Sequence, residues 1–279
     1  LQINSSSFHV IGIDVGISQI RVIATQLDAK IIKSLQINMP STLTNELLLR
    51  LLVQAVDSIM ENAPLTKETI IGIGIGMHGL VDPLKGVSLF APNFDLRNIP
   101  IKEKLESELG IPVEVDNDVR AMALSEGWFG QGVGVDNFIC INVGVGIGAG
   151  LVLDNKVYRG SSHTAGEMGH TTIVANGPKC SCGNYGCLQM LASGPAIALR
   201  AQNNIDKNGK IAELCGGNFD RLDGETVYQA ALQKDELAIK ILQNTGKYLG
   251  IAIANVINLM NPSRVIIGGG VSKSGDFIL

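Results

Sequence analysis

One arrangement, an apolar strand, a glycine turn and a second apolar strand, occurs twice in this chain of 279 residues. The first copy has strand-like residues 10–15 and 20–25, and the second has 138–143 and 149–153. Helical patterns follow each copy. A pattern of this kind predicts a duplicated α/β unit built around a central cleft.

The spacing of apolar residues predicts most of the remaining elements. The expected strands and helices are, in chain order, 43–60 (helix), 70–75 (strand), 101–109 (helix), 112–115 (strand), 119–128 (helix), 237–259 (helix) and 264–267 (strand). The long helix at 237–259 is suited to a buried position or to an oligomer contact.

The length of the chain favours two domains over one. We expect a linker at 1–8, an N-terminal α/β domain at 9–115 and a C-terminal α/β domain at 116–279. The chain opens on Leu1 through a polar stretch and stops at Leu279 soon after a glycine turn, so we expect missing segments at both ends.

The composition narrows the classes of partner. Hydrophobic residues make up 46% of the chain and aromatic residues only 4%, which is typical of an aliphatic α/β interior. Acidic residues outnumber basic ones by 26 to 22, and no basic run occurs, so a broad contact of this chain with DNA is not expected. No apolar stretch is long enough for a membrane span, and we expect a cytoplasmic protein.

Cysteines provide the most specific local signal. Three of the five, Cys180, Cys182 and Cys187, lie within eight residues, and His170 is just upstream. Three thiols and one imidazole gathered by a glycine-bearing loop form the ligand set of a closed, structural zinc site. Such a site has no open coordination position for a substrate or a water, which argues against a metal-dependent hydrolase. Glu167 lies three residues before His170 and would share the geometry that the metal imposes on that histidine. The alternative is three loop cysteines that lie close together by chance.

Two glycine turns and one polar triplet are candidates for ligand chemistry. Glycines in the turns after Asp14 and Val143 would let backbone N–H groups approach phosphate, but neither turn is a P-loop and both can be simple tight turns. Asn117 and Asp118 precede a predicted helix. They can cap that helix, and a carboxylate there can also serve as a general base or an acceptor.

In their order along the chain, these motifs resemble the ROK family, which groups bacterial sugar kinases with sugar-responsive transcriptional repressors. The resemblance spans nearly the whole chain and rests on Asp14-Val15-Gly16, residues 74–82, Asp116-Asn117-Asp118, residues 144–150, Glu167-Met168-Gly169-His170, the cysteine loop and residues 268–270. It implies an actin/hexokinase-like duplicated fold, with two α/β domains flanking a sugar-binding cleft. It also implies that His170, Cys180, Cys182 and Cys187 bind a structural Zn²⁺.

The resemblance assigns further roles residue by residue. Asp118 corresponds to the base that takes the proton of the sugar 6-hydroxyl in the kinases. Residues implied to bind or border the sugar are Gly79, Asn93, Asn117, Asp118, Glu167, His170 and Gln189. If the protein is a kinase, ATP and Mg²⁺ would bind near Asp14, Gly16, Gly144, Gly146 and Gly269.

Departures from the kinase pattern favour the repressor branch. Kinases of the family read Asp-x-Gly-Gly-Thr-Lys, whereas this chain has Ile17 in place of the second glycine, which crowds the phosphate site. The second turn lacks a hydroxyl that would meet phosphate, and Gln189 replaces a sugar-facing glutamate. The polar N-terminal stretch also resembles the linker that follows the helix-turn-helix domain of these repressors.

The leading hypothesis is therefore a sugar-sensing and oligomerising domain of a ROK-type regulator. Its expected ligand is a monosaccharide or a sugar phosphate, it would contact DNA only through a domain outside this chain, and it would form a homodimer or homotetramer without a membrane partner. The alternative is an ATP-dependent hexose kinase of the glucokinase or N-acetylhexosamine kinase type. The sequence does not name the sugar.

Two histidines and two cysteines remain. His78 stands where the family often has proline beside the sugar, yet a lone loop histidine is more often structural, and His163 calls for the same caution. Cys140 and Cys215 are most simply a core thiol and a loop thiol.

Overall fold

A computed structural model describes residues 4–63, 65–204 and 209–278 and divides the chain into two compact units. The first unit contains Leu1–Ser125 and Arg159–Thr164, and the second contains Glu126–Tyr158 and Ala165–Leu279. Residues 1–3 of the expected linker lie outside the described part, and Ser5–Ser7 form a short 3₁₀ turn capped by Asn4.

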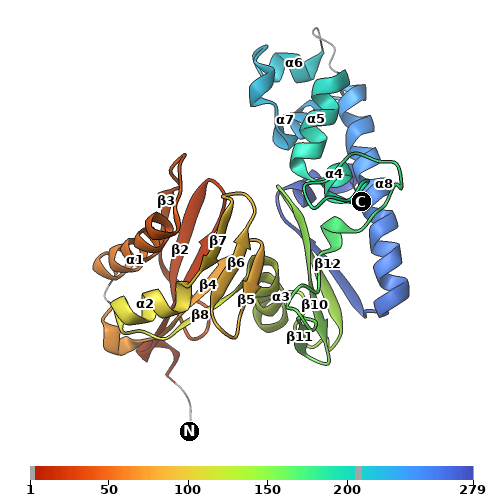
Figure 1. Ribbon diagram of the computed structural model, residues 1–279. Helices are drawn as coiled ribbons and strands as arrows, with labels where there is room; N and C mark the ends of the chain where they lie inside the picture. Colours follow the sequence, from red (N-terminus) through yellow and green to blue (C-terminus); the bar gives the residue numbers. More distant parts are fainter. Residues whose placement is uncertain (1–3, 64, 205–208, 279) are drawn as a thin grey trace. The chain divides into compact units, whose positions relative to one another are not determined.

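A five-stranded sheet forms the centre of the first unit (Figure 1). Its strand order is β3-β2-β1-β4-β8. Its strands are β1 (His9–Val15), β2 (Gln19–Gln26), β3 (Ile31–Asn38), β4 (Ile70–Met77) and β8 (Val113–Asn117). Strand β1 pairs antiparallel with β2 and parallel with β4, and β4 pairs parallel with β8. The hairpin-like pair and the strands at 70–75 and 112–115 are thus confirmed.

Helices α1 (Asn45–Glu61) and α2 (Ile101–Leu109) pack against each other in this unit, and α1 also contacts β2 and β3. The Thr44 side chain caps α1 by accepting a hydrogen bond from Leu47 N at 3.2 Å. Along α1, apolar side chains recur at helical spacing and bury one face, which includes Leu48, Leu52 and Ile59. Gly110 ends α2 in the left-handed conformation, which suits glycine.

A second, three-stranded sheet in the first unit was not predicted from the sequence. It consists of β5 (Leu80–Asp82), β6 (Val87–Ala91) and β7 (Leu96–Ile99), all antiparallel. These strands are short, so their periodicity is weak in the sequence.

The sheet of the second unit repeats the arrangement of the first, in the order β11-β10-β9-β12. Its strands are β9 (Phe138–Val143), β10 (Ile147–Leu153), β11 (Lys156–Tyr158) and β12 (Arg264–Gly268). Strand β9 pairs antiparallel with β10 and parallel with β12, as β1 does with β2 and β4. This common topology confirms the predicted duplication.

Helix α3 (Asp118–Phe129) begins in the first unit, and the described residues of the second unit form five further α-helices. These are α4 (Gln189–Ala192), α5 (Gly194–Asn204), α6 (Lys210–Leu214), α7 (Gly224–Leu232) and α8 (Glu236–Met260). Asp235 caps α8, which buries one face that includes Ile241 and Leu242, whereas Leu259 near its end is 82% exposed. Within the described ranges, no helix is long and apolar enough to cross a membrane.

Candidate functional site

Four metal-binding side chains converge in the second unit. The donor atoms of His170, Cys180, Cys182 and Cys187 all lie within 4.8 Å of one another. Cys180 Sγ is 3.6 Å from His170 Nδ1, and Cys182 Sγ is 3.7 Å from Cys187 Sγ. In a tetrahedral site with metal–sulfur bonds of about 2.3 Å, neighbouring ligand atoms are about 3.6–3.8 Å apart. The donor set therefore fits a tetrahedral metal ion.

Residues 180–187, here called the metal loop, are shaped by backbone hydrogen bonds and one glycine. Cys180 N donates to Asn184 O at 2.8 Å, and Gly183 N donates to Cys180 O at 3.0 Å. Gly186 has a φ of +64°, and a Cβ there would lie 2.7 Å from the carbonyl carbon of Val174. Because only glycine fits this contact, the loop closes tightly enough to bring its thiols together.

The close packing of sulfur atoms separates the thiol pKa values. Burial raises the pKa of Cys180, but hydrogen bonds from Cys182, His170 and Cys187 outweigh it and bring the value to about 6. Burial and the neighbouring sulfur atoms of Cys182 and Cys180 raise the pKa of Cys187 to about 12. Neighbouring sulfurs thus compete for protons, as coupled groups do.

His170 presents its two ring nitrogens to different partners. Nδ1 faces the metal loop, while Nε2 lies 3.9 Å from the Glu167 carboxylate. Both residues lie at the short 3₁₀ turn Met168–His170, and Glu167 directly precedes it. A ring that binds metal through Nδ1 carries its proton on Nε2, so this nitrogen would be a donor.

Gln189, the first residue of α4, connects the metal loop to the second glycine turn. Its Nε2 donates to Cys180 Sγ at 3.6 Å. Its Oε1 lies 3.7 Å from the position that a Cβ on Gly146 would occupy. The amide therefore hydrogen-bonds a metal ligand, a contact that the sequence did not suggest.

In the first unit, three parallel strands end side by side. Val15 of β1 pairs with Met77 of β4, which pairs with Asn117 of β8. His78 and Asp118 follow β4 and β8, so both begin beyond the same edge of the sheet. The carboxyl ends of parallel strands are the usual place for ligand-binding residues in α/β folds.

Asn117 caps helix α3, as one of the two sequence interpretations predicted. Its Oδ1 accepts hydrogen bonds from Val119 N at 3.0 Å and from Arg120 N at 3.2 Å. Its Nδ2 donates to Gly79 O at 3.1 Å. Both the oxygen and the nitrogen of the Asn117 amide are thus held by hydrogen bonds, and the second N–H of Nδ2 can be donated to a ligand.

Gly79 lets a neighbouring turn approach this edge. Its φ is +87°, and a Cβ would lie 2.7 Å from Pro92 Cδ. The turn carries the exposed Asn93 and also Phe94, whose ring meets the His78 ring edge-on at 4.8 Å. Gly79, Asn93, Asn117 and Asp118 therefore occupy one region of the first unit.

Asp118 and His78 are both partly buried at this edge, and burial shifts each pKa toward the neutral form. Burial raises the pKa of Asp118, with Asp14 adding to the rise, while a hydrogen bond from Val119 N and the charge of His78 oppose it. Burial lowers the pKa of His78, whose Nδ1 lies 3.3 Å from Val15 O. A buried carboxyl with a raised pKa in such a position is typical of functional sites.

The first glycine turn is closed by Gly16, whose N–H donates to Gln19 O at 3.0 Å. Asp14, at the end of β1, accepts a hydrogen bond from Arg21 Nε at 2.8 Å. Ile17 is 37% exposed at the tip of the turn.

The second glycine turn lies in the second unit. Gly144 N donates to Gly146 O at 2.9 Å, and Gly144 O accepts from Gly194 N, at the start of α5, at 2.8 Å. Gly269 has a φ of +92° and packs against Val143, because a Cβ would lie 2.7 Å from that residue's carbonyl carbon. The predicted nucleotide-binding glycines of this unit therefore also have structural roles.

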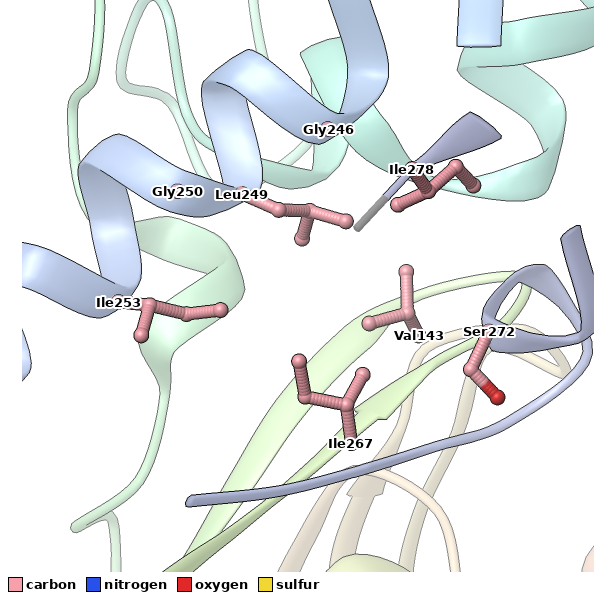
Figure 2. A pocket seen from close by; sticks show the side chains of 8 residues that line it. All are labelled: Val143, Gly246, Leu249, Gly250, Ile253, Ile267, Ser272 and Ile278. Carbon is pink, nitrogen blue, oxygen red and sulfur yellow. The ribbon is translucent and has the colours of Figure 1, made fainter. Parts of the chain in front are cut away.

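An apolar pocket lies in the second unit. It has a volume of about 150 Å³ and lies between α8, β9, β12 and the segment after β12 (Figure 2). Its lining residues are Val143, Gly246, Leu249, Gly250, Ile253, Ile267, Ser272 and Ile278. A sugar needs several polar partners, so this pocket does not suit one.

Comparison with known proteins identifies the family. The ROK family profile matches residues 10–278. The chain belongs to the ROK family. It is 35% identical to a xylose repressor of Caldicellulosiruptor bescii, over all of this chain and 70% of that protein.

Two solved ROK structures are also similar. One is a glucokinase from Streptomyces griseus in complex with glucose and AMPPNP, with 34% identity, a TM-score of 0.85 and coverage of 97% of this chain and 86% of that one. The other is a ROK transcriptional regulator, a homologue of the E. coli MLC protein, with 31% identity, a TM-score of 0.86 and coverage of 99% and 69%. The actin/hexokinase-like fold of this ROK chain is thus confirmed, while both regulators and kinases are among its relatives.

Sequence reasoning missed an ion-pair cluster in the first unit. Asp116 pairs with Arg120, four residues later, and with Arg159, 43 residues later. Asp116 belongs to β8 and Arg120 to α3, so the spacing of the first pair is not that of two residues on one helix and gave no signal. No sequence signal connects Asp116 with Arg159.

Proposed function

We propose that this chain is the sugar-sensing and oligomerising part of a ROK transcriptional regulator of carbohydrate metabolism. The observation that carries this proposal lies at the first glycine turn, where Arg21 engages the Asp14 carboxylate and Ile17 replaces a glycine of the kinases. A carboxylate paired with arginine is less available to a metal-bound nucleotide, and a β-branched side chain obstructs close approach of phosphate.

The ligand in this proposal is a monosaccharide or a sugar phosphate. A neutral sugar ring is recognised by several fixed donors and acceptors, and an unpaired partner makes the wrong epimer costly. Asn117 would offer its remaining N–H, and Asp118 would accept from a hydroxyl. The resemblance to ROK sugar kinases implies further hydroxyl contacts for Glu167 and His170, and it implies that Gly79, Asn93 and Gln189 border the sugar.

Zinc is the metal proposed for the Cys₃His donor set, because soft thiolates with one imidazole in tetrahedral array favour it. When bound, zinc supplies a rigid anchor for the four side chains. His170 would then hold Nε2–H toward the ligand, and the contact with Glu167 would fix the orientation of both groups.

The regulator would respond through a change in the population of its conformations, so the sugar must bind one of them more tightly. We further propose that it acts in the cytoplasm as a homodimer or homotetramer. DNA would be contacted by a helix-turn-helix domain other than the two units described above.

An ATP-dependent hexose kinase is the second candidate, supported by the Asp118 carboxyl and by the glucokinase relatives. In this case Asp118 would accept the proton of the attacking hydroxyl, and its raised pKa would favour that transfer. Asp14, Gly16, Gly144, Gly146 and Gly269 would border ATP and Mg²⁺.

Titration calorimetry with glucose, xylose, N-acetylglucosamine and their phosphates tests sugar binding. The Asp118→Asn variant should bind the active sugar at least roughly tenfold more weakly, because a charged acceptor is lost. Asp57→Asn, at an exposed position of α1, serves as the matched control and should bind as the wild type does. Binding of no sugar and no sugar phosphate by the wild type would contradict the proposal.

A coupled assay of ADP release separates regulator from kinase. The regulator hypothesis predicts no sugar-dependent ADP release with Mg²⁺ and ATP. Sugar-dependent turnover that disappears in Asp118→Asn and persists in Asp57→Asn would instead establish the kinase.

A further inference from the structure

Six residues of the second half of the chain belong to the first unit. Arg159–Thr164, here called the strap, cluster with Leu1–Ser125, whereas the segments on both sides of them belong to the second unit. A short segment of this kind needs specific contacts to hold it, because ordering its backbone costs conformational entropy.

Asp116 supplies the first of these contacts. Its Oδ2 accepts two hydrogen bonds from the Arg159 guanidinium, from Nη2 at 2.7 Å and from Nε at 3.2 Å. Asp116 is also the residue directly before Asn117, and its Oδ1 accepts the Asn117 N–H at 2.7 Å. One carboxylate thus connects the strap to the end of β8.

Arg120 supplies the second contact. Its side chain is only 4% exposed, its Nε lies 3.0 Å from Asp116 Oδ1, and its Nη1 donates to His163 O in the strap at 3.0 Å. The backbone N–H of the same residue donates to Asn117 Oδ1. Arg120 therefore touches the strap with its side chain and Asn117 with its main chain.

The cluster surrounds the start of helix α3. Asn117 is bound to Asp116 through its N–H, to Arg120 through its Oδ1 and to Gly79 through its Nδ2. Since Asp118 is the next residue, the position of its carboxylate depends on how firmly Asn117 is held. Charge-assisted and bidentate contacts are the kind that fix a side chain within a narrow range.

We propose that Asp116, Arg120 and Arg159 are positioning residues for Asn117 and Asp118, and that the strap serves to hold them in place. This inference rests on the proposed role of Asn117 and Asp118 in sugar binding. The three residues act through the cap of α3 and do not themselves contact the ligand.

A double-mutant cycle on sugar affinity tests the proposal, with glucose and xylose as probes. Arg159→Met keeps an unbranched apolar stem and removes the charged guanidinium, at a position that is 35% exposed. This change should weaken binding roughly tenfold, within the range for residues of one hydrogen-bond network. In an Asp118→Asn background the same change should have little further effect, because the cluster acts through Asp118.

Lys104→Met is the matched control, since Lys104 forms a 2.7 Å ion pair with Glu108 on α2 of the same unit. It should leave affinity unchanged in both backgrounds. Arg159→Lys retains the charge and should recover part of the affinity that Arg159→Met loses. If Arg159→Met lowers affinity equally with and without Asp118, or not at all, the proposal is wrong.

Hydrogen exchange gives a readout that needs no sugar. The amides of Val119 and Arg120 bond to Asn117, so Arg159→Met should speed their exchange, while exchange in β1 stays as in the wild type. Unchanged exchange at these two amides overturns the positioning role. If the wild type binds neither sugar, the proposed function has failed for these ligands, and hydrogen exchange alone decides the positioning role.

Discussion

Replacing Asp118 by asparagine should stabilise the first unit while it weakens the binding of a sugar. Burial is the largest cause of the raised pKa of Asp118, so the folded state bears a cost for the charged carboxylate at neutral pH. Asparagine removes the charge but keeps an oxygen that can accept the Val119 N–H, which lies 2.9 Å from Asp118 Oδ1. The substitution thus removes the unfavourable free energy of burying a charge and retains the hydrogen bond.

The magnitude follows from the linkage between proton binding and folding. Each unit by which the native pKa is raised costs about 1.4 kcal/mol at neutral pH. The dipole of α3 favours an anion in its first turn by about 0.3–1 kcal/mol, which reduces the gain from asparagine. We therefore expect the free energy of unfolding to rise in Asp118→Asn, by roughly 0.5–2 kcal/mol, the usual range for a stabilising substitution.

The pH dependence has a definite sign. Because its pKa is raised, the native carboxyl takes up a proton at a higher pH than the unfolded one. Between the two pKa values the native state holds more protons, so wild-type stability falls as the pH rises through this window. The advantage of Asp118→Asn should be largest at pH 7 and shrink as the pH falls toward the ordinary value for aspartate.

Hydrogen exchange measured by mass spectrometry on peptides of β4 and β8 reports the stability of the first unit by itself, which matters because two units need not unfold together. Asp57→Asn should change it by less than about 0.5 kcal/mol, since Asp57 is exposed. If Asp118→Asn proves less stable than the wild type at pH 7, or its advantage does not shrink on acidification, the burial argument fails.

Chelation of the metal by 1,10-phenanthroline, or the exchange Cys182→Ser, should lower both zinc content and the melting temperature; a zinc-free protein of unchanged melting temperature would contradict a structural metal. Leu52→Ala should cost about 2–5 kcal/mol in denaturant unfolding, because Leu52 is fully buried in the first core. Gly79→Ala should cost at least about 1–2 kcal/mol, because it places a side chain at a φ of +87°, and the same denaturation assay measures it. Burial lowers the pKa of His78 in the native state, so the unfolded chain binds a proton first as the pH falls and the wild type loses stability below about pH 6.5. His78→Phe should reduce this loss of stability. Identical curves of unfolding free energy against pH for the variant and the wild type would contradict the prediction.

Much of the fold could be predicted because its signals are local. The predicted helix at 101–109 coincides with α2, and the strands at 138–143 and 264–267 match β9 and β12 closely. Strong periodicity and glycine turns carry this information in short windows. The sheet of β5, β6 and β7 was missed because its strands are three to five residues long and show little alternation.

In the candidate site, too, local features could be predicted from the sequence and contacts between distant residues could not. The clustering of the candidate metal donors could be predicted because three of them lie within eight residues, and two of their separations, 3.6 and 3.7 Å, are compatible with one tetrahedron. The cap at Asn117 could also be predicted, since a polar residue directly preceded a helical pattern. Only the three-dimensional structure shows the contact of Gln189 with Cys180 and the pairing of Arg21 with Asp14. The spacing of residues along the sequence does not give the direction in which a side chain points.

The sequence by itself determined the duplicated α/β pattern and the clustering of three cysteines with His170, because strand periodicity, glycine turns and clustered side chains act over short distances. The order of these motifs also gave the resemblance to the ROK family. Only the tertiary structure decided that Arg159 returns to the first unit and joins Asp116 and Arg120 around the start of α3. The physical reason is that an ion pair depends on distance in space, and 43 residues of chain separate Asp116 from Arg159.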